Sequence, residues 1–177
     1  MSKAQDLDIQ AVNTLRFLSV DAVQKAESGH PGLPLGAAPT AYVLYDRILK
    51  FNPRDPGWID RDRFVLSAGH ESALIYTMLT YIGWLKVDDL QKFRQLGSIT
   101  PGHPERGLTP GVEATTGPLG QGVGNAVGMA ISESILQETF GKDIISHYTY
   151  VLHGDGDIQE PVAMGSVAGE PEQRSRP

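Results

Sequence analysis

Gly154-Asp155-Gly156 directly follows residues 148–152, a β-branched and aromatic run that is typical of a buried strand. Ligands of open α/β sheets bind beyond the carboxyl ends of the strands, which is where this tripeptide would lie. The two glycines would let a diphosphate approach the backbone, and one carboxylate with diphosphate oxygens and water suits octahedral Mg²⁺. Gly-Asp-Gly is also a common turn sequence, so the motif alone leaves both interpretations open.

Three histidines occupy turns that are bounded by Gly or Pro, namely His30, His70 and His103. A rigid turn can aim an imidazole at a substrate hydroxyl or phosphate. Each histidine alone could equally have a structural role, and the shared setting of all three favours one common polar site. They lack the short paired spacing of a zinc site.

Residues 115–122 form a Gly-rich sequence, TTGPLGQG, at the start of a helical pattern. Backbone amides at such a helix start can face an anion or a polar heterocycle. The alternative is a tight junction between loop and helix, which would need glycine without binding anything.

Hydrophobic spacing and Gly turns predict an α/β fold with a mostly parallel sheet flanked by helices. Gly120, Gly124 and Gly128 recur at four-residue spacing, which favours close packing of their helix. The tail after Glu160 lacks periodicity and is predicted to be disordered. Helices are predicted over residues 6–27, 37–51, 71–84, 88–96 and 119–140, strands over 63–67 and 148–152, and a long loop over 97–118.

The composition excludes several classes of function. The 177 residues are 40% hydrophobic and 20% charged, carry a formal net charge of −6 and include no cysteine. Disulfides, thiolate nucleophiles and Cys-rich zinc sites are therefore excluded. The acidic balance and the absence of a Lys/Arg cluster argue against nucleic-acid binding, and no apolar run approaches the length of a membrane span. We expect a cytoplasmic protein.

Five segments together resemble the transketolase family, in its order and at its spacing across most of residues 10–160. PGHPE followed by TTGPLGQG and then GDG is specific to that family, and deoxyxylulose-phosphate synthase matches these motifs less closely. The segments are SGHPGLPLG, RDRFVLSAGHES, FRQLGSITPGHPE, TPGVEATTGPLGQGVGNAVGMA and HYTYVLHGDGDIQE.

The resemblance implies a thiamine-diphosphate-binding fold and transfer of a two-carbon ketol unit from a ketose phosphate to an aldose phosphate. It also implies thiamine diphosphate and Mg²⁺ (or Ca²⁺) as cofactors, sugar phosphates as substrates and a homodimer in the intact family. By matching motif, Asp155 would ligate the metal, His30 and His103 would face the sugar, and Glu160 would help to link the two cofactor sites of the dimer. The cofactor would contact His70, Gly117, Leu119, Gly154, Asp155 and Gly156.

The chain departs from the family pattern after Glu160, where Pro161 replaces the usual Gly and the last eight residues match nothing in the family. The resemblance implies that a cofactor motif of this kind continues into an Asn-containing second half and that a pyrimidine-binding domain follows, and we recognise neither in these 177 residues. We therefore expect residues 1–160 to be a partial diphosphate-binding domain, incomplete at its C-terminal side, and residues 161–177 to be a divergent tail. Such a chain would be inactive alone; the alternative is a non-catalytic remnant that pairs with an intact transketolase.

Overall fold

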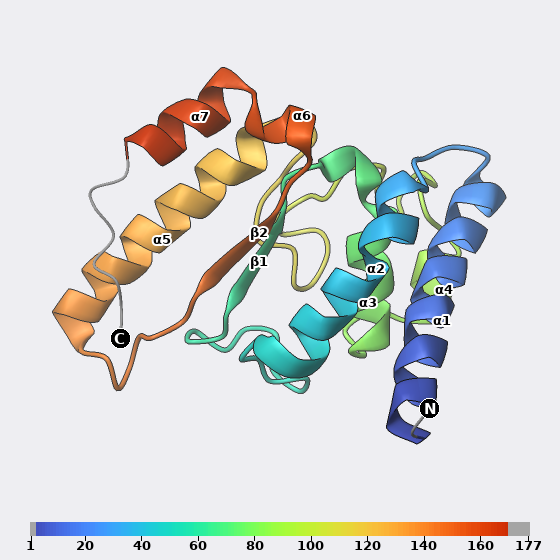
Figure 1. The fold of residues 1–177 in the computed structure, drawn as a ribbon, viewed down its shortest axis with the longest axis horizontal. Coiled ribbons are helices and arrows are strands. Elements are labelled where there is room, and N and C mark those ends of the chain that lie inside the picture. The colour runs from blue at the N-terminus through green and yellow to red at the C-terminus, as the bar shows by residue number, and fades with distance from the viewer. Residues whose placement is uncertain (1–2, 170–177) are drawn as a thin grey trace.

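The computed structural model describes residues 3–169 of the chain (Figure 1). Two long helices, α1 and α5, lie on opposite sides of a small central sheet. The elements in chain order are α1 (Lys3–Ala26), α2 (Gly32–Val43), a π-helical turn η1 (Leu44–Ile48), β1 (Arg63–Leu66), a 3₁₀ turn η2 (Gly69–Glu71), α3 (Ala73–Tyr81), α4 (Val87–Leu90), α5 (Gln121–Phe140), β2 (Thr149–Leu152), α6 (Asp155–Ile158) and α7 (Pro161–Ala168).

The sheet consists of β1 and β2, which pair in parallel with Arg63 opposite Thr149 and Leu66 opposite Leu152. The two predicted strands and their parallel pairing are confirmed. The predicted fold class is confirmed only in part, because the described residues are mostly helical and hold just these two strands. A parallel pair cannot be joined by a hairpin, and here the connection carries α3, α4 and α5.

The two faces of the sheet pack against different helices, as the alternation of side chains along a strand requires. Phe64 and Leu66 of β1 join the large apolar core formed with α1, α2 and α3, whereas Val65 packs on the other face with Ala126 of α5. In Figure 1 the strands accordingly lie between α5 on one side and α2 with α3 on the other.

Asp60 and Asp62 fasten the beginnings of the two strands to one another. Asp62 accepts the Tyr148 amide at 2.7 Å and the Lys50 amide at 2.8 Å. Asp60 accepts the Ser146 amide at 2.5 Å and the Lys50 ammonium at 2.6 Å. Burial alone would raise the pKa of Asp60, but the bonds from Lys50 and Ser146 lower it to about 2.

The segment after Glu160 corrects the predicted disordered tail. Residues 161–168 form α7, which starts with Pro161 in its first turn and packs on α5 through the fully buried Ala163. Added methyl groups at Gly120 and Gly124 would lie 2.8 Å and 3.5 Å from Val162, so these glycines admit the helix, whereas Gly128 faces open space. The sequence lacked this signal because tertiary contact with α5, rather than its own periodicity, stabilises α7. Residues 170–177 of the predicted tail lie outside the described residues.

The long loop predicted over residues 97–118 is confirmed, since neither helix nor strand occurs between α4 and α5. The helix predicted over 37–51 instead begins at Gly32, carries Pro39 inside it and continues into η1. Among the described residues, no helix is both long and apolar enough to cross a membrane.

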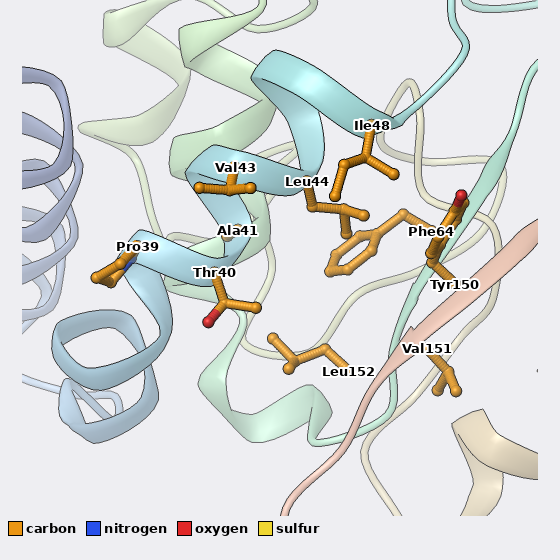
Figure 2. Close-up of a pocket in the computed structure, with 10 residues that line it drawn as sticks. All are labelled: Pro39, Thr40, Ala41, Val43, Leu44, Ile48, Phe64, Tyr150, Val151 and Leu152. Carbon is orange, nitrogen blue, oxygen red and sulfur yellow. The ribbon is translucent and has the colours of Figure 1, made fainter. Parts of the chain in front are cut away.

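An apolar cavity of about 540 Å³ separates α2 and η1 from β2 (Figure 2). Val43, Leu44 and Ile48 line it from α2 and η1, and Phe64 and Leu152 line it from the strands. Its lining holds no carboxylate and no imidazole. The cavity therefore lacks the charged side chains and imidazoles that usually hold a metal ion.

Candidate functional site

Some of the predicted site residues follow the carboxyl ends of the two parallel strands. β1 ends at Leu66 and leads within four residues to His70, while β2 ends at Leu152 and leads through His153 to Gly154 and Asp155. Because Leu66 and Leu152 are partners in the sheet, both segments leave it at the same level. This is the edge at which ligands bind in parallel sheets.

His30 and His70 meet edge to face, with ring centroids 4.9 Å apart. His30 lies in the turn between α1 and α2, and His70 lies in η2. Glu71 fixes their relation, because its carboxylate accepts the Leu33 amide at 3.2 Å and lies 3.8 Å from Nε2 of His70. Two segments that are far apart in sequence thus present their imidazoles together.

His103 joins this pair from the long loop. Burial lowers the pKa of His103, and the charge of Arg94 and the two other histidines lower it further. Two hydrogen bonds anchor the turn that carries His103. Tyr76 of α3 donates to the His103 carbonyl at 3.3 Å, and Ser72, the residue before α3, donates to the Gly102 carbonyl at 2.8 Å. The three histidines form one cluster, which we call the histidine cluster.

The first half of the Gly-rich loop, residues 115–122, lies against the histidine cluster. A methyl group on Gly69 would lie 2.5 Å from the Thr116 hydroxyl oxygen and 2.7 Å from the Gly117 nitrogen. One on Gly117 would lie 3.2 Å from the ring of His103. Only backbone without a side chain fits at Gly69, so the close approach of η2 and this loop requires glycine.

The second half of the same loop lies against the segment that follows β2. Gly120 has a φ of +80°, and a methyl group there would lie 2.7 Å from Cβ of Glu160. The Gly120 amide donates a hydrogen bond to the carboxylate of Asp157, whose side chain is almost fully buried. The loop therefore connects the histidine cluster to the Gly154-Asp155-Gly156 segment, and Leu119 within this loop is 39% exposed.

Asp155 is the first residue of α6 and is exposed, and methyl groups on Gly154 and Gly156 would meet nothing within 4 Å. Backbone and carboxylate are thus open to a ligand. Within residues 3–169 no group of three or more His, Asp or Glu side chains could hold a metal ion. A metal here would take Asp155 as its carboxylate ligand and oxygens of a bound ligand and water as the others.

Two buried polar atoms beside the loop have no hydrogen-bond partner among the described residues, namely Oγ1 of Thr116 and Oδ2 of Asp157. Buried polar groups are normally satisfied, so each of these atoms has capacity for a ligand or water. Together with the open glycines and the exposed Asp155, they fit a polar, anionic group bound through a cation.

Sequence reasoning missed Glu71, Arg94, Thr116 and Asp157. Arg94 donates to the Ser28 hydroxyl at 3.0 Å, and its guanidinium also lies 3.5 Å from the Gly102 carbonyl, so it joins the turns of His30 and His103. The sequence did offer a signal for three of these residues, because they adjoin predicted site residues. Glu71 follows His70, Thr116 precedes Gly117 and Asp157 follows Gly156.

Comparison with known proteins gives consistent matches. Residues 7–171 match the family described as "Transketolase, thiamine diphosphate binding domain". A transketolase of Aquifex aeolicus is 56% identical over an alignment of 172 positions, which covers 94% of this chain and 25% of that protein. The structure resembles a transketolase from Leishmania mexicana with a TM-score of 0.87 and 53% identity, covering 90% of this chain and 24% of that one.

A further similar structure is a Pichia stipitis transketolase in complex with sedoheptulose 7-phosphate, with a TM-score of 0.86 and 52% identity over 90% of this chain and 24% of that chain. The chain therefore spans about a quarter of the length of the relatives that it matches.

Proposed function

Because this chain belongs to the transketolase family, we propose that it forms the diphosphate-binding part of a thiamine diphosphate site that serves ketol transfer between sugar phosphates. The observation that carries the proposal is the continuity of the site. One loop, residues 116–120, contacts the histidine turns at one end and the segment after β2 at the other. A cofactor with an anionic tail would find both within reach.

Asp155 would hold Mg²⁺ or Ca²⁺, and the open backbone at Gly154 and Gly156 would approach the diphosphate that completes the coordination. His70 would hydrogen-bond the diphosphate from the other side. Gly117 and Leu119 would contact the cofactor along the loop that joins these groups. When bound, thiamine diphosphate supplies the electron sink that lets a carbon–carbon bond of a ketose break.

His30 and His103 would bind sugar hydroxyls and move protons at their imidazole nitrogens. Burial, Arg94 and the neighbouring histidines lower the pKa of His103, which favours the neutral imidazole that can accept a proton near pH 7. Glu160, whose Cβ lies beside Gly120, would support the loop and link the site to that of a second subunit.

We expect the chain by itself to lack ketol-transfer activity and to bind the cofactor weakly, because one carboxylate is a poor Mg²⁺ site without further protein ligands. The test therefore uses two proteins, the chain and a chimera in which it replaces the matching quarter of the A. aeolicus transketolase. Calorimetry with Mg²⁺ should detect no thiamine diphosphate binding tighter than about 1 mM for the chain alone. The chimera should bind the cofactor and transfer ketol units.

In the chimera, Asp155→Asn should weaken thiamine diphosphate binding by about tenfold or more, since a charged ligand to the cation is lost. Asp143→Asn is the matched control, because Asp143 is exposed and follows the C-terminal end of α5, whereas the Gly-rich loop precedes the start of that helix. His103→Ala should lower kcat/KM by about 10²-fold or more. Unchanged cofactor affinity in Asp155→Asn would contradict the proposal.

A second candidate is a non-catalytic role in which the chain pairs with an intact transketolase. The apolar cavity of Figure 2 favours it, because an accessible apolar surface of this kind is typical of an interaction site. Co-purification with the A. aeolicus enzyme, lost in a cavity variant such as Ile48→Lys, would support this role.

A further inference from the structure

A second cavity, of about 550 Å³, lies at the other end of β1 from the histidine cluster. Arg61 and Arg63 line it from the beginning of the strand, and residues 106–113 of the long loop and Met129 of α5 complete it. The proposed cofactor site lies at the carboxyl end of the same strand. The cavity is thus a separate feature of the fold and does not depend on the proposed cofactor site.

One acidic side chain lines this cavity, and it is already neutralised. Glu113 forms an ion pair with Arg61, and the two side chains are only 11% and 10% exposed. Arg61 also donates to the Pro56 carbonyl at 2.6 Å and to the Asp62 carbonyl at 3.3 Å. This pair holds the loop against the strand and contributes no net charge to the cavity.

Arg63 is half-buried, and within residues 3–169 its guanidinium donates a hydrogen bond to the Ile59 carbonyl at 2.7 Å. Burial lowers the pKa of Arg63. The negative charges of Glu113 and Asp60 raise this pKa, and the positive charges of Arg61 and Arg106 lower it further. An arginine stays protonated in proteins, so this guanidinium is a positive charge without a bound carboxylate.

Arg106 brings a second positive charge from the long loop. Its backbone amide donates to the Thr115 hydroxyl at 3.0 Å, and its side chain has neither hydrogen bond nor ion pair in the described part of the chain. The cavity is therefore lined by three guanidinium groups and one carboxylate, which leaves two positive charges. The whole chain, by contrast, carries a net charge of −6.

We propose that this cavity binds a small dianion, the phosphate group of a phosphorylated metabolite, through Arg63 and Arg106. A guanidinium donates two parallel hydrogen bonds to a phosphate, and two such groups match the charge of a phosphate monoester near neutral pH. The volume of the cavity leaves room for a small organic group attached to that phosphate.

The experiment is a calorimetric titration of the full chain with inorganic phosphate, in a buffer without phosphate or sulfate. We expect saturable binding that Arg106→Gln weakens by about tenfold, through loss of one bidentate contact. Arg54→Gln, which removes the same charge from an exposed surface position, should leave the affinity unchanged. Because Arg106 is exposed and unpaired, its variant should remain folded, which its far-ultraviolet circular dichroism will establish.

Glycerol 3-phosphate and succinate distinguish a phosphate ester from a dicarboxylate as the ligand. The phosphate ester should bind at least as tightly as inorganic phosphate, and succinate more weakly. Absence of saturable phosphate binding, equal weakening by Arg54→Gln, or tighter binding of succinate would overturn the proposal. So would phosphate binding that His70→Asn abolishes and Arg106→Gln leaves unchanged, because that result would place the anion at the histidine cluster.

Discussion

At the scale of single residues, the protonation of His103 depends on Arg94. Burial and the nearby positive charge of Arg94 lower the pKa of this imidazole. We predict that Arg94→Met raises the pKa of His103, whereas Arg54→Met, an exposed arginine outside the site, does not. The measurement is an NMR titration of the His103 Cε1 proton in the chain, with resonances assigned by His103→Gln. An unchanged pKa in Arg94→Met would show that Arg94 does not act on this histidine.

Some residues of the candidate site can be predicted from the sequence and others cannot. His30, His70 and His103 stand in Gly/Pro turns, and their meeting could be expected because rigid turns point side chains outward. No local sequence pattern identifies Arg94 or Asp157. Their roles depend on hydrogen bonds to residues far along the chain, which are Ser28 for Arg94 and Gly120 for Asp157. A pairing between distant residues is a property of the fold and leaves no local pattern.

At the scale of elements, the contact between α5 and α7 depends on which glycine faces the partner helix. We predict that Gly120→Ala destabilises the chain by about 1–2 kcal/mol, because φ there is +80° and the added methyl group would lie 2.7 Å from Cβ of Glu160. Gly128→Ala is the matched control on the same helix. It meets open space and should stabilise by up to about 1 kcal/mol through helix propensity.

Urea denaturation followed by circular dichroism measures both variants. Equal effects of the two substitutions would contradict both the left-handed backbone at Gly120 and its close contact with Glu160. Periodicity was sufficient to predict the strands and most helices, because each carries an apolar face of its own. It failed for α7, whose eight residues bury Ala163 alone and depend on the room that Gly120 and Gly124 leave.

The hydrogen bonds of Asp60, which connect the beginnings of the two strands, predict how the stability of the chain depends on pH. The pKa of Asp60 is about 2, below the value near 3.9 of an unfolded aspartate, so the folded state resists protonation of this carboxylate. Its stabilisation is present above about pH 4 and is lost as the pH falls from about 4 to 2. Asp60→Asn should lower the free energy of unfolding at pH 7 by about 2 kcal/mol and flatten its dependence on pH in that window.

Urea denaturation at several pH values checks this expectation, with Asp143→Asn as the control for an exposed aspartate. A wild-type stability that stays constant between pH 5 and 2 would contradict the prediction, and so would a decrease that persists unchanged in Asp60→Asn. The loss would then belong to other groups.

At the scale of the whole molecule, the apolar cavity of Figure 2 lies beside the less buried strand. All four residues of β2 are only partly buried, whereas three of the four in β1 are buried. Ile48 and Val43, which line the cavity, are 52% and 38% exposed. A parallel strand is normally covered on both faces, so this surface favours association of one chain with another.

We therefore predict that the chain self-associates reversibly as its concentration rises, and that Ile48→Lys weakens this association by placing a charge in the cavity. Ile135→Lys is the matched control, because Ile135 is 62% exposed on α5 and lies outside the cavity. Sedimentation velocity over a range of concentrations distinguishes the variants, and binding of a fluorescent apolar dye reports the cavity itself. If wild type remains monomeric, or both lysine variants change association equally, the cavity does not join chains, and its apolar lining serves the fold alone.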